Sequence, residues 1–177
     1  MKIILIGIQG SGKSTQGNLL SEKLSIPYVS MGNIFREMAK QGTDLGKFIE
    51  QTINTGKLIP DEKTLPIIGE YLKKPEYQNG YILDGFPRTI AQAESFDQDI
   101  NYVIYLKVSD KEALWRISTR KDVRQDETLG ALRKRIDLFH EATEPVLDYY
   151  RQKNVLMEVD GEQSIEDIHK EILSKIS

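Results

Sequence analysis

Three glycines, a lysine and several hydroxyl residues are clustered in the run GIQGSGKST, which spans residues 7–15. Their spacing matches G-x-x-x-x-G-K-[ST], the phosphate-binding loop of the Walker A type. Glycines let the backbone wrap so that successive N–H groups point at phosphate oxygens, and a following helix adds the partial positive charge of its N-terminus. We therefore expect this loop to bind the phosphates of a nucleotide. The predicted binding residues are Gly10, Ser11, Gly12, Lys13, Ser14 and Thr15.

The sequence also predicts a magnesium site. In the loop, Lys13 can reach the β and γ phosphates, and the Ser14 hydroxyl can contact Mg²⁺. Asp84 ends an apolar run within YILDGFPR, residues 81–88, where a carboxylate can hold the water shell of the ion. Asp84 could instead serve only as a turn residue before Gly85. We assign Ser14 and Asp84 to the metal site and expect Mg²⁺ to arrive with the nucleotide.

Arginines are the third group of candidates. Arg116 and Arg120 are four residues apart, so they project from one face of a predicted helix. For any single arginine, a solvated ion pair on a helix surface is the simpler explanation. Their shared placement is more informative, because all lie near expected carboxyl ends of strands or in inserted segments. The set comprises Arg36, Arg88, Arg116, Arg120, Arg124 and Arg135.

Five apolar segments are predicted to form the strands that position these residues. Amphipathic stretches of helical length separate the segments, and this alternation indicates a parallel sheet with right-handed crossovers. We predict an α/β fold of the P-loop NTPase type, with a doubly wound five-stranded parallel sheet flanked by helices. Ligands of such sheets bind at the carboxyl ends of the strands. The predicted strands are residues 3–6, 26–30, 80–85, 102–108 and 155–160.

Two intervals are too long for a plain crossover. Residues 31–79 contain three helical patterns separated by glycine and proline, which indicates an insertion outside the sheet. Residues 109–153 contain a helix, a polar joint over 120–128 and a long helix that Pro145 should kink. The apolar residues of the final helical segment, including Ile165, are expected to pack in the core.

Composition limits the function classes. The 177 residues fit one domain, and the net charge of −3 predicts no general affinity for nucleic acid or anionic membranes. The chain has no cysteine and two widely separated histidines, so we expect neither disulfides nor a zinc site. Its apolar N-terminal run is too short for a signal peptide or a membrane span. We expect a cytoplasmic monomer.

The motifs together resemble those of the adenylate kinases, or more broadly the nucleoside monophosphate kinases. The resemblance runs from Met1 to the C-terminal helix, with the motifs in the order and spacing of the family. They are GxxGSGKSTQ, MGNIFRE, GKLIPDE, GYILDGFPRTIAQAE, RxxxR followed by RxDE, RKRI and EPVLDYY.

This resemblance implies a division of the single domain and two nucleotide sites. The core would comprise residues 1–29, 60–120 and 127–177, with a helical monophosphate-binding insertion over 30–59 and a very short lid at about 121–126. Besides the phosphate loop, ATP would contact Arg116, Arg120 and Gln163. AMP would contact Met31, Gly32, Arg36, Lys57, Leu58, Ile59, Gly85, Phe86, Pro87, Arg88, Gln92, Arg124 and Arg135. The catalytic residues would be Lys13, Arg88, Arg120, Arg124 and Arg135.

The implied reaction is the reversible, Mg²⁺-dependent conversion of ATP and AMP into two ADP. Members of the family usually carry Thr or Ser where this chain has Met31, and Asp where it has Asn33. Thr89 and Gln92 follow the pattern of the kinases that act on AMP. The Gln92 amide can hydrogen-bond to the edge of adenine as a donor and an acceptor together. Transfer to UMP, CMP or GMP is an alternative. A non-catalytic nucleotide sensor is another, although a pure binder needs no cluster of cations aimed at a transferring phosphate.

Overall fold

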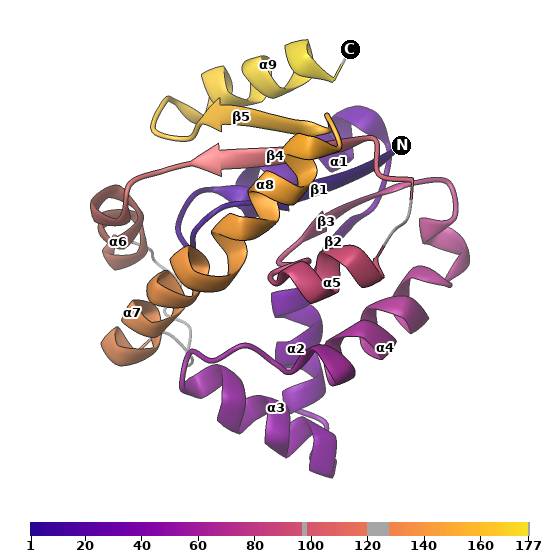
Figure 1. Cartoon of the computed structure of the whole chain (residues 1–177), viewed down its shortest axis with the longest axis vertical. Helices are drawn as coiled ribbons and strands as arrows, with labels where there is room; N and C mark the ends of the chain where they lie inside the picture. The colour runs from indigo at the N-terminus through magenta and orange to yellow at the C-terminus, as the bar shows by residue number, and fades with distance from the viewer. Residues whose placement is uncertain (97–98, 120–127, 177) are drawn as a thin grey trace.

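A computed structural model describes residues 1–96, 99–119 and 128–176, and contains one five-stranded parallel sheet (Figure 1). The strand order is β2-β3-β1-β4-β5, which confirms the predicted fold class. The ends of the strands differ from the predicted ranges by no more than two residues. The strands are β1 (Lys2–Ile6), β2 (Tyr28–Ser30), β3 (Tyr81–Asp84), β4 (Tyr102–Lys107) and β5 (Leu156–Asp160).

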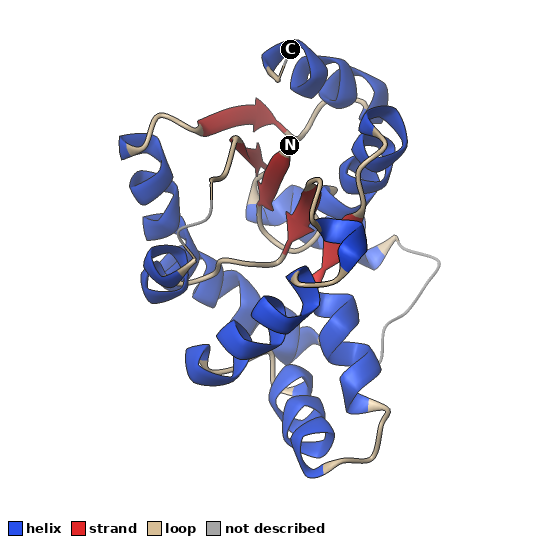
Figure 2. Cartoon of the chain, turned by 90° about the vertical axis from the view of Figure 1, so that its right-hand side faces the viewer, coloured by secondary structure: helices blue, strands red, loops and turns tan. Residues whose placement is uncertain are grey.

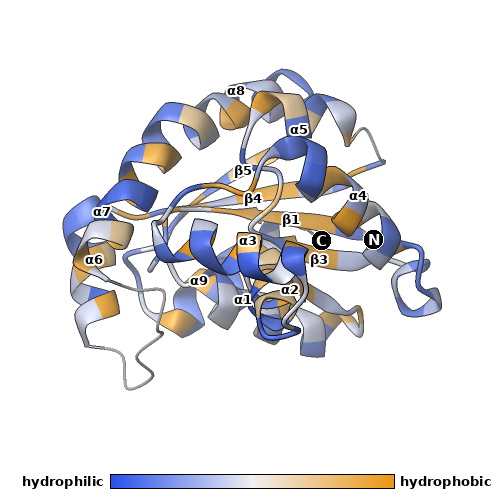
Figure 3. Cartoon of the chain, turned by 90° about the horizontal axis from the view of Figure 1, so that it is seen from below, coloured by the Kyte–Doolittle hydropathy of each residue, from blue (hydrophilic) through white to orange (hydrophobic). Residues whose placement is uncertain are grey.

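Both faces of the sheet are covered by helices (Figure 2). Alternate residues of β1 point to opposite faces, so Ile3 and Leu5 pack with one group of helices and Ile4 and Ile6 with the other. On the first face lie α1 (Lys13–Leu24) and α9 (Ile165–Lys175). On the second lie α4 (Asp61–Leu72), α5 (Ile90–Ser95), α6 (Asp110–Ser118), α7 (Leu129–Leu138) and α8 (Glu144–Gln152). Strands in Figure 3 are accordingly mostly hydrophobic, whereas the helices are of mixed hydropathy.

The predicted insertion contains α2 (Met31–Ala39) and α3 (Asp44–Asn54), which pack on each other below the sheet in Figure 1. Ser30 and Thr43 cap these helices, because each side chain accepts a hydrogen bond from the backbone N–H three residues later. With α4, they confirm the three helical patterns predicted within residues 31–79. A short 3₁₀ helix, η1 (Pro75–Tyr77), precedes β3.

The long helix predicted over residues 129–153 is interrupted before its proline. A π-helical turn, η2 (Phe139–Thr143), joins α7 to α8, and Pro145 lies in the first turn of α8. The α-helical hydrogen bonding is disrupted there because proline has no N–H to donate to a carbonyl of the preceding turn.

The prediction that Ile165 packs in the core is wrong. Ile168 and Ile172 of α9 are buried, but Ile165 is 52% exposed. Ile165 is the first residue of the helix, and its backbone carbonyl, which accepts from Gln16 Nε2 at 2.9 Å, contacts α1 in place of its side chain. In the described part of the chain, no helix has both the length and the apolar character to cross a bilayer.

Candidate active site

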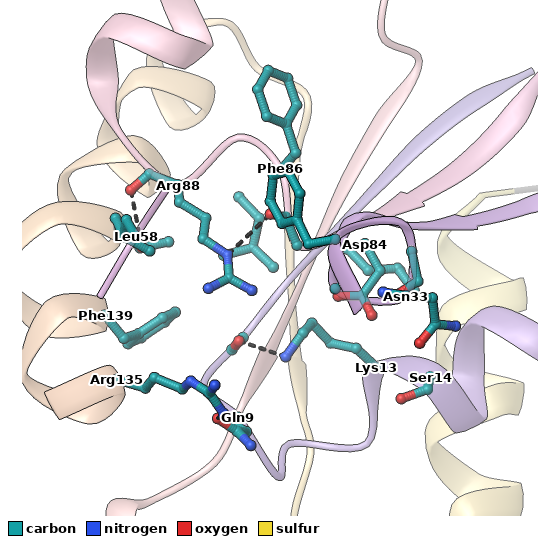
Figure 4. Close-up of a pocket in the computed structure, with 18 of the residues that line it drawn as sticks. Gln9, Lys13, Ser14, Asn33, Leu58, Asp84, Phe86, Arg88, Arg135 and Phe139 are labelled. Carbon is teal, nitrogen blue, oxygen red and sulfur yellow. Dashed lines mark hydrogen bonds between the residues drawn. The ribbon is translucent and has the colours of Figure 1, made fainter. Parts of the chain in front are cut away.

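A cavity of about 300 Å³ lies at the carboxyl ends of β1 and β3, between the phosphate loop, the insertion and α7 (Figure 4). Sixteen residues predicted from the sequence line it. They are Gly10, Gly12, Lys13, Ser14, Gly32, Arg36, Lys57, Leu58, Ile59, Asp84, Gly85, Phe86, Pro87, Arg88, Gln92 and Arg135.

Other predicted site residues lie elsewhere. Met31 packs in the core and is 1% exposed, so its side chain offers no face to a nucleobase in this structure. Arg116 forms an ion pair with Glu112 at 2.7 Å. Predicted residues that do not line the cavity are Ser11, Thr15, Met31, Arg116 and Gln163. Arg120, Arg124 and the predicted lid at 121–126 lie outside the described residues.

The phosphate loop depends on glycine at two positions. Gly10 and Gly12 have φ angles of +93° and +92°, which side chains other than glycine rarely adopt. A Cβ atom on Gly10 would also lie 2.5 Å from the carbonyl oxygen of Ala113 in α6. The loop wraps around Lys13, whose Nζ donates to the carbonyls of Gly7 at 2.7 Å and Ile8 at 2.9 Å. Since α1 begins at Lys13, its N-terminus and the ammonium lie together, an arrangement suited to an anion.

Asp84 is positioned by the sheet register, because β3 pairs with β1 on one side and β2 on the other. Tyr28 Oη donates to Asp84 Oδ2 at 2.7 Å. Burial and the Asp84 carboxylate raise the pKa of Tyr28 far above its usual range, so its hydroxyl stays a donor. Asp84 Oδ1 is buried and has no hydrogen-bond partner among the described residues. A buried carboxylate oxygen without a partner, lining the same cavity as the Ser14 hydroxyl, fits the hard-oxygen chemistry of Mg²⁺.

Five cationic side chains line the cavity from different parts of the chain: Lys13, Arg36, Lys57, Arg88 and Arg135. Figure 4 labels Lys13, Arg88 and Arg135. Arg88 Nε donates to the Gly85 carbonyl at 3.0 Å, which aims the guanidinium into the cavity. Burial lowers the pKa of Arg88; Asp84 opposes this, and the nearby charges of Arg135 and Arg36 add to the lowering. Gathered like charges attract an anionic ligand, so the site is suited to polyphosphates.

Arg135 spans the cavity between two segments. Its Nη1 donates to Gln9 Oε1 in the phosphate loop at 3.1 Å, and its Nη2 donates to the carbonyl of Ile53 in α3 at 2.9 Å. Sequence reasoning missed Gln9, because the motif accepts any residue there. It also missed Phe139, which lines the cavity and lies four residues after Arg135, a spacing that could have indicated a shared helix face.

Comparisons with known proteins agree with this geometry. The family model described as adenylate kinase matches residues 5–155. An adenylate kinase of Azobacteroides pseudotrichonymphae is 40% identical over 185 residues, covering 99% of this chain and 97% of the relative. An adenylate kinase of Caldicellulosiruptor bescii is 36% identical over 212 residues, covering 99% of both. One from Archaeoglobus fulgidus is 36% identical over 208 residues, covering 97% of this chain and 96% of the relative. Because the family model covers most of the chain and these relatives align with nearly all of it, the chain belongs to the adenylate kinase family.

Proposed function

We propose that this protein catalyses the reversible transfer of the terminal phosphoryl group of Mg²⁺-bound ATP to AMP, giving two ADP. The observation that carries the proposal is the convergence of Lys13, Arg88 and Arg135 on one cavity from three separate segments. One bound triphosphate needs only the loop and its lysine. Cations on the opposite side suit a second phosphate group, as transfer between two nucleotides requires.

The residues divide into two proposed nucleotide sites. ATP phosphates bind to residues 10–15, and Ser14 and Asp84 are the residues that would hold Mg²⁺. When bound, the ion neutralises phosphate charge and aligns the transferring group. AMP binds between the insertion and the loop after β3. Its proposed contacts are Gly32, Arg36, the backbone of residues 57–59, Arg88 and Gln92.

The proposed chemistry requires no strong general base. The acceptor oxygen of a nucleoside monophosphate is already anionic near neutral pH, and the barrier arises from bringing two polyanions into line. Lys13 orients the β and γ phosphates, while Arg88 and Arg135 neutralise charge on the acceptor and the transferring group. Arg120 and Arg124 are proposed to add positive charge from the lid side.

A shortened lid over residues 121–126 is also proposed. The alignment with the Caldicellulosiruptor bescii relative extends over 212 residues, although this chain has 177, so about 35 aligned positions face gaps in this chain. A lid reduced to a few residues would account for that difference.

The decisive experiment is a coupled assay of ADP formation with ATP and Mg²⁺, using AMP, GMP, CMP and UMP as acceptors in separate reactions. We expect AMP to have the highest kcat/KM. Nucleotide binding without turnover would instead indicate a sensor, and preference for another acceptor would overturn the assignment to AMP. Light scattering after gel filtration and cell fractionation would test the proposed monomer and its cytoplasmic location.

A further inference from the structure

The side-chain amide of Gln92 is held at both ends. The backbone N–H of Arg88 donates to Gln92 Oε1 at 2.7 Å, and Gln92 Nε2 donates to Asp61 Oδ1 at 2.7 Å. Gln92 is 2% exposed, yet it lines the cavity, so this buried amide faces the ligand space. Asp61 is the first residue of α4 and has no role in the proposed reaction.

These two partners permit a single orientation of the amide. An ionised carboxylate only accepts hydrogen bonds, and a backbone N–H only donates. Rotating the amide by 180° would place Oε1 against Asp61 and Nε2 against the N–H of Arg88. Both hydrogen bonds would be lost, and like partial charges would face each other in a buried position.

Asp61 is itself fixed by a third residue. Thr89 Oγ1 donates to Asp61 Oδ2 at 2.9 Å and accepts from the backbone N–H of Gln92 at 3.1 Å. The Asp61 carboxylate therefore holds both Thr89, the N-cap residue of α5, and the side-chain amide of Gln92. An acidic side chain is also favoured at this position by the N-terminal partial positive charge of α4.

The orientation matters because purines differ in polarity along one edge. Adenine presents an N6 donor beside the N1 acceptor, whereas a 6-oxopurine presents an O6 acceptor beside an N1 donor. Each end of the Gln92 amide retains a second hydrogen-bonding position, since the oxygen has two lone pairs and the nitrogen two protons. A fixed amide can match one of these edges, while a freely flipping amide could match both.

We propose that Asp61 is a specificity-determining positioning residue, which fixes the Gln92 amide so that the acceptor site accepts adenine and rejects 6-oxopurine monophosphates. This inference rests on the proposed function, because it requires AMP to be the acceptor that meets Gln92.

The test is Asp61→Asn, assayed with AMP and with IMP, a monophosphate whose base is a 6-oxopurine without the 2-amino group of guanine. An asparagine can turn either its oxygen or its NH₂ toward Gln92, so the flipped amide regains a partner at that end and only the N–H of Arg88 still favours the original orientation. We expect the ratio of kcat/KM for IMP to that for AMP to rise by about tenfold, the scale of a lost bidentate base contact. The change should lie mainly in KM.

Two controls separate this role from a structural one. Asp44→Asn makes the same change at the first residue of α3, away from Gln92, and should leave the ratio unaltered. In a Gln92→Ala background, adding Asp61→Asn should no longer change the ratio, because Asp61 acts through that amide.

The inference would be overturned if the IMP-to-AMP ratio of Asp61→Asn stayed within about twofold of the parent ratio, because the loss of a bidentate base contact should change the ratio by about tenfold. If Asp61→Asn does not fold, Thr89 offers a second test. Thr89→Val removes the hydroxyl that donates to Asp61 and should raise the ratio, whereas Thr89→Ser keeps that donor and should not. Equal ratios in these two variants would also overturn the inference. Failure of the proposed function is distinguishable, because the parent protein would then not phosphorylate AMP.

Discussion

The phosphate loop of residues 7–15 and the insertion of residues 30–59 line one cavity, but they are held in different ways. The loop follows β1, in which Ile3 and Ile4 are fully buried, and its conformation is fixed by glycines and by Lys13 donating to backbone carbonyls. In α3 of the insertion the buried residues are Gly46 and Ile49, while Phe48 is 37% exposed. The loop is therefore preorganised, whereas within the insertion α2 joins the main core and α3 depends on a small local core shared with α2.

Helix α7 connects the two regions. Arg135 bonds to Gln9 in the loop and to Ile53 in the insertion, and a Cβ on Gly56 would lie 2.4 Å from the carbonyl oxygen of Ala131. The C-terminal end of the insertion, at Gly56, thus lies close to the first turn of α7.

The largest effect is expected from removing the fixed cation of the loop. Lys13→Ala should lower kcat by about 10³-fold, because the charge nearest the transferring phosphate is lost. The fold should persist, since Lys13 lies at the surface of the cavity and outside the hydrophobic core. The coupled assay and circular dichroism measure these outcomes, with Lys47→Ala in α3 as the control. Turnover near that of the parent would contradict the proposed role of the loop.

A smaller loss is expected at the connection between the regions. Arg135→Ala should lower kcat by about 10²-fold, because it removes a phosphate cation and both bridging hydrogen bonds. Arg133→Ala, an exposed change on the same helix, is the matched control. If Arg135→Ala raised KM alone and left kcat intact, Arg135 would be a binding residue without a catalytic role.

The metal site tests the donor side further. Asp84→Asn should raise the Mg²⁺ concentration needed for half-maximal activity by about tenfold, because the amide is a weaker ligand than a carboxylate. Calorimetric titration with ATP gives an independent readout: affinity in Mg²⁺ should fall, whereas affinity in EDTA should not. Asp137→Asn, an exposed carboxylate of α7, should behave as the parent. An unchanged Mg²⁺ dependence would remove Asp84 from the metal site.

Core substitutions address the difference in packing directly. Ile4→Ala in β1 and Ile49→Ala in α3 each delete a fully buried side chain, a change that costs about 2–5 kcal/mol in unfolding free energy. For Ile49→Ala, we expect hydrogen exchange to increase mainly in α2 and α3, because few other elements pack on that core. Ile4→Ala should increase exchange throughout the sheet. Equal increases everywhere in both variants would show that the insertion unfolds only with the sheet.

The two regions also differ in how well the sequence predicts them. The loop and its strands were predictable because the phosphate motif is local and strands buried on both faces read as continuous apolar runs. Helices of the insertion followed from their periodicity. The hydrogen bond between Gln92 and Asp61, 31 residues apart, had no local signal, and neither did the contact of Arg135 with Gln9. Sequence patterns predicted which residues line the cavity better than how those residues hold one another.

The smallest effect concerns His140 of η2, whose ring contacts Asp110 of α6 and Glu144 of α8. Hydrogen bonds that its ring nitrogens donate to the carboxylates of Glu144 and Asp110 raise its pKa above the usual 6.5. Because the folded pKa is the higher one, this stabilisation is complete below about pH 6.5 and is lost as the pH rises through the folded pKa. The melting temperature of His140→Gln should therefore lie slightly below that of the parent at pH 6 and converge with it near pH 9. A gap that widened toward pH 9 would contradict this sign. A large gap at pH 6 would mean that this exposed ion pair between η2 and α6 contributes more to stability than such pairs normally do.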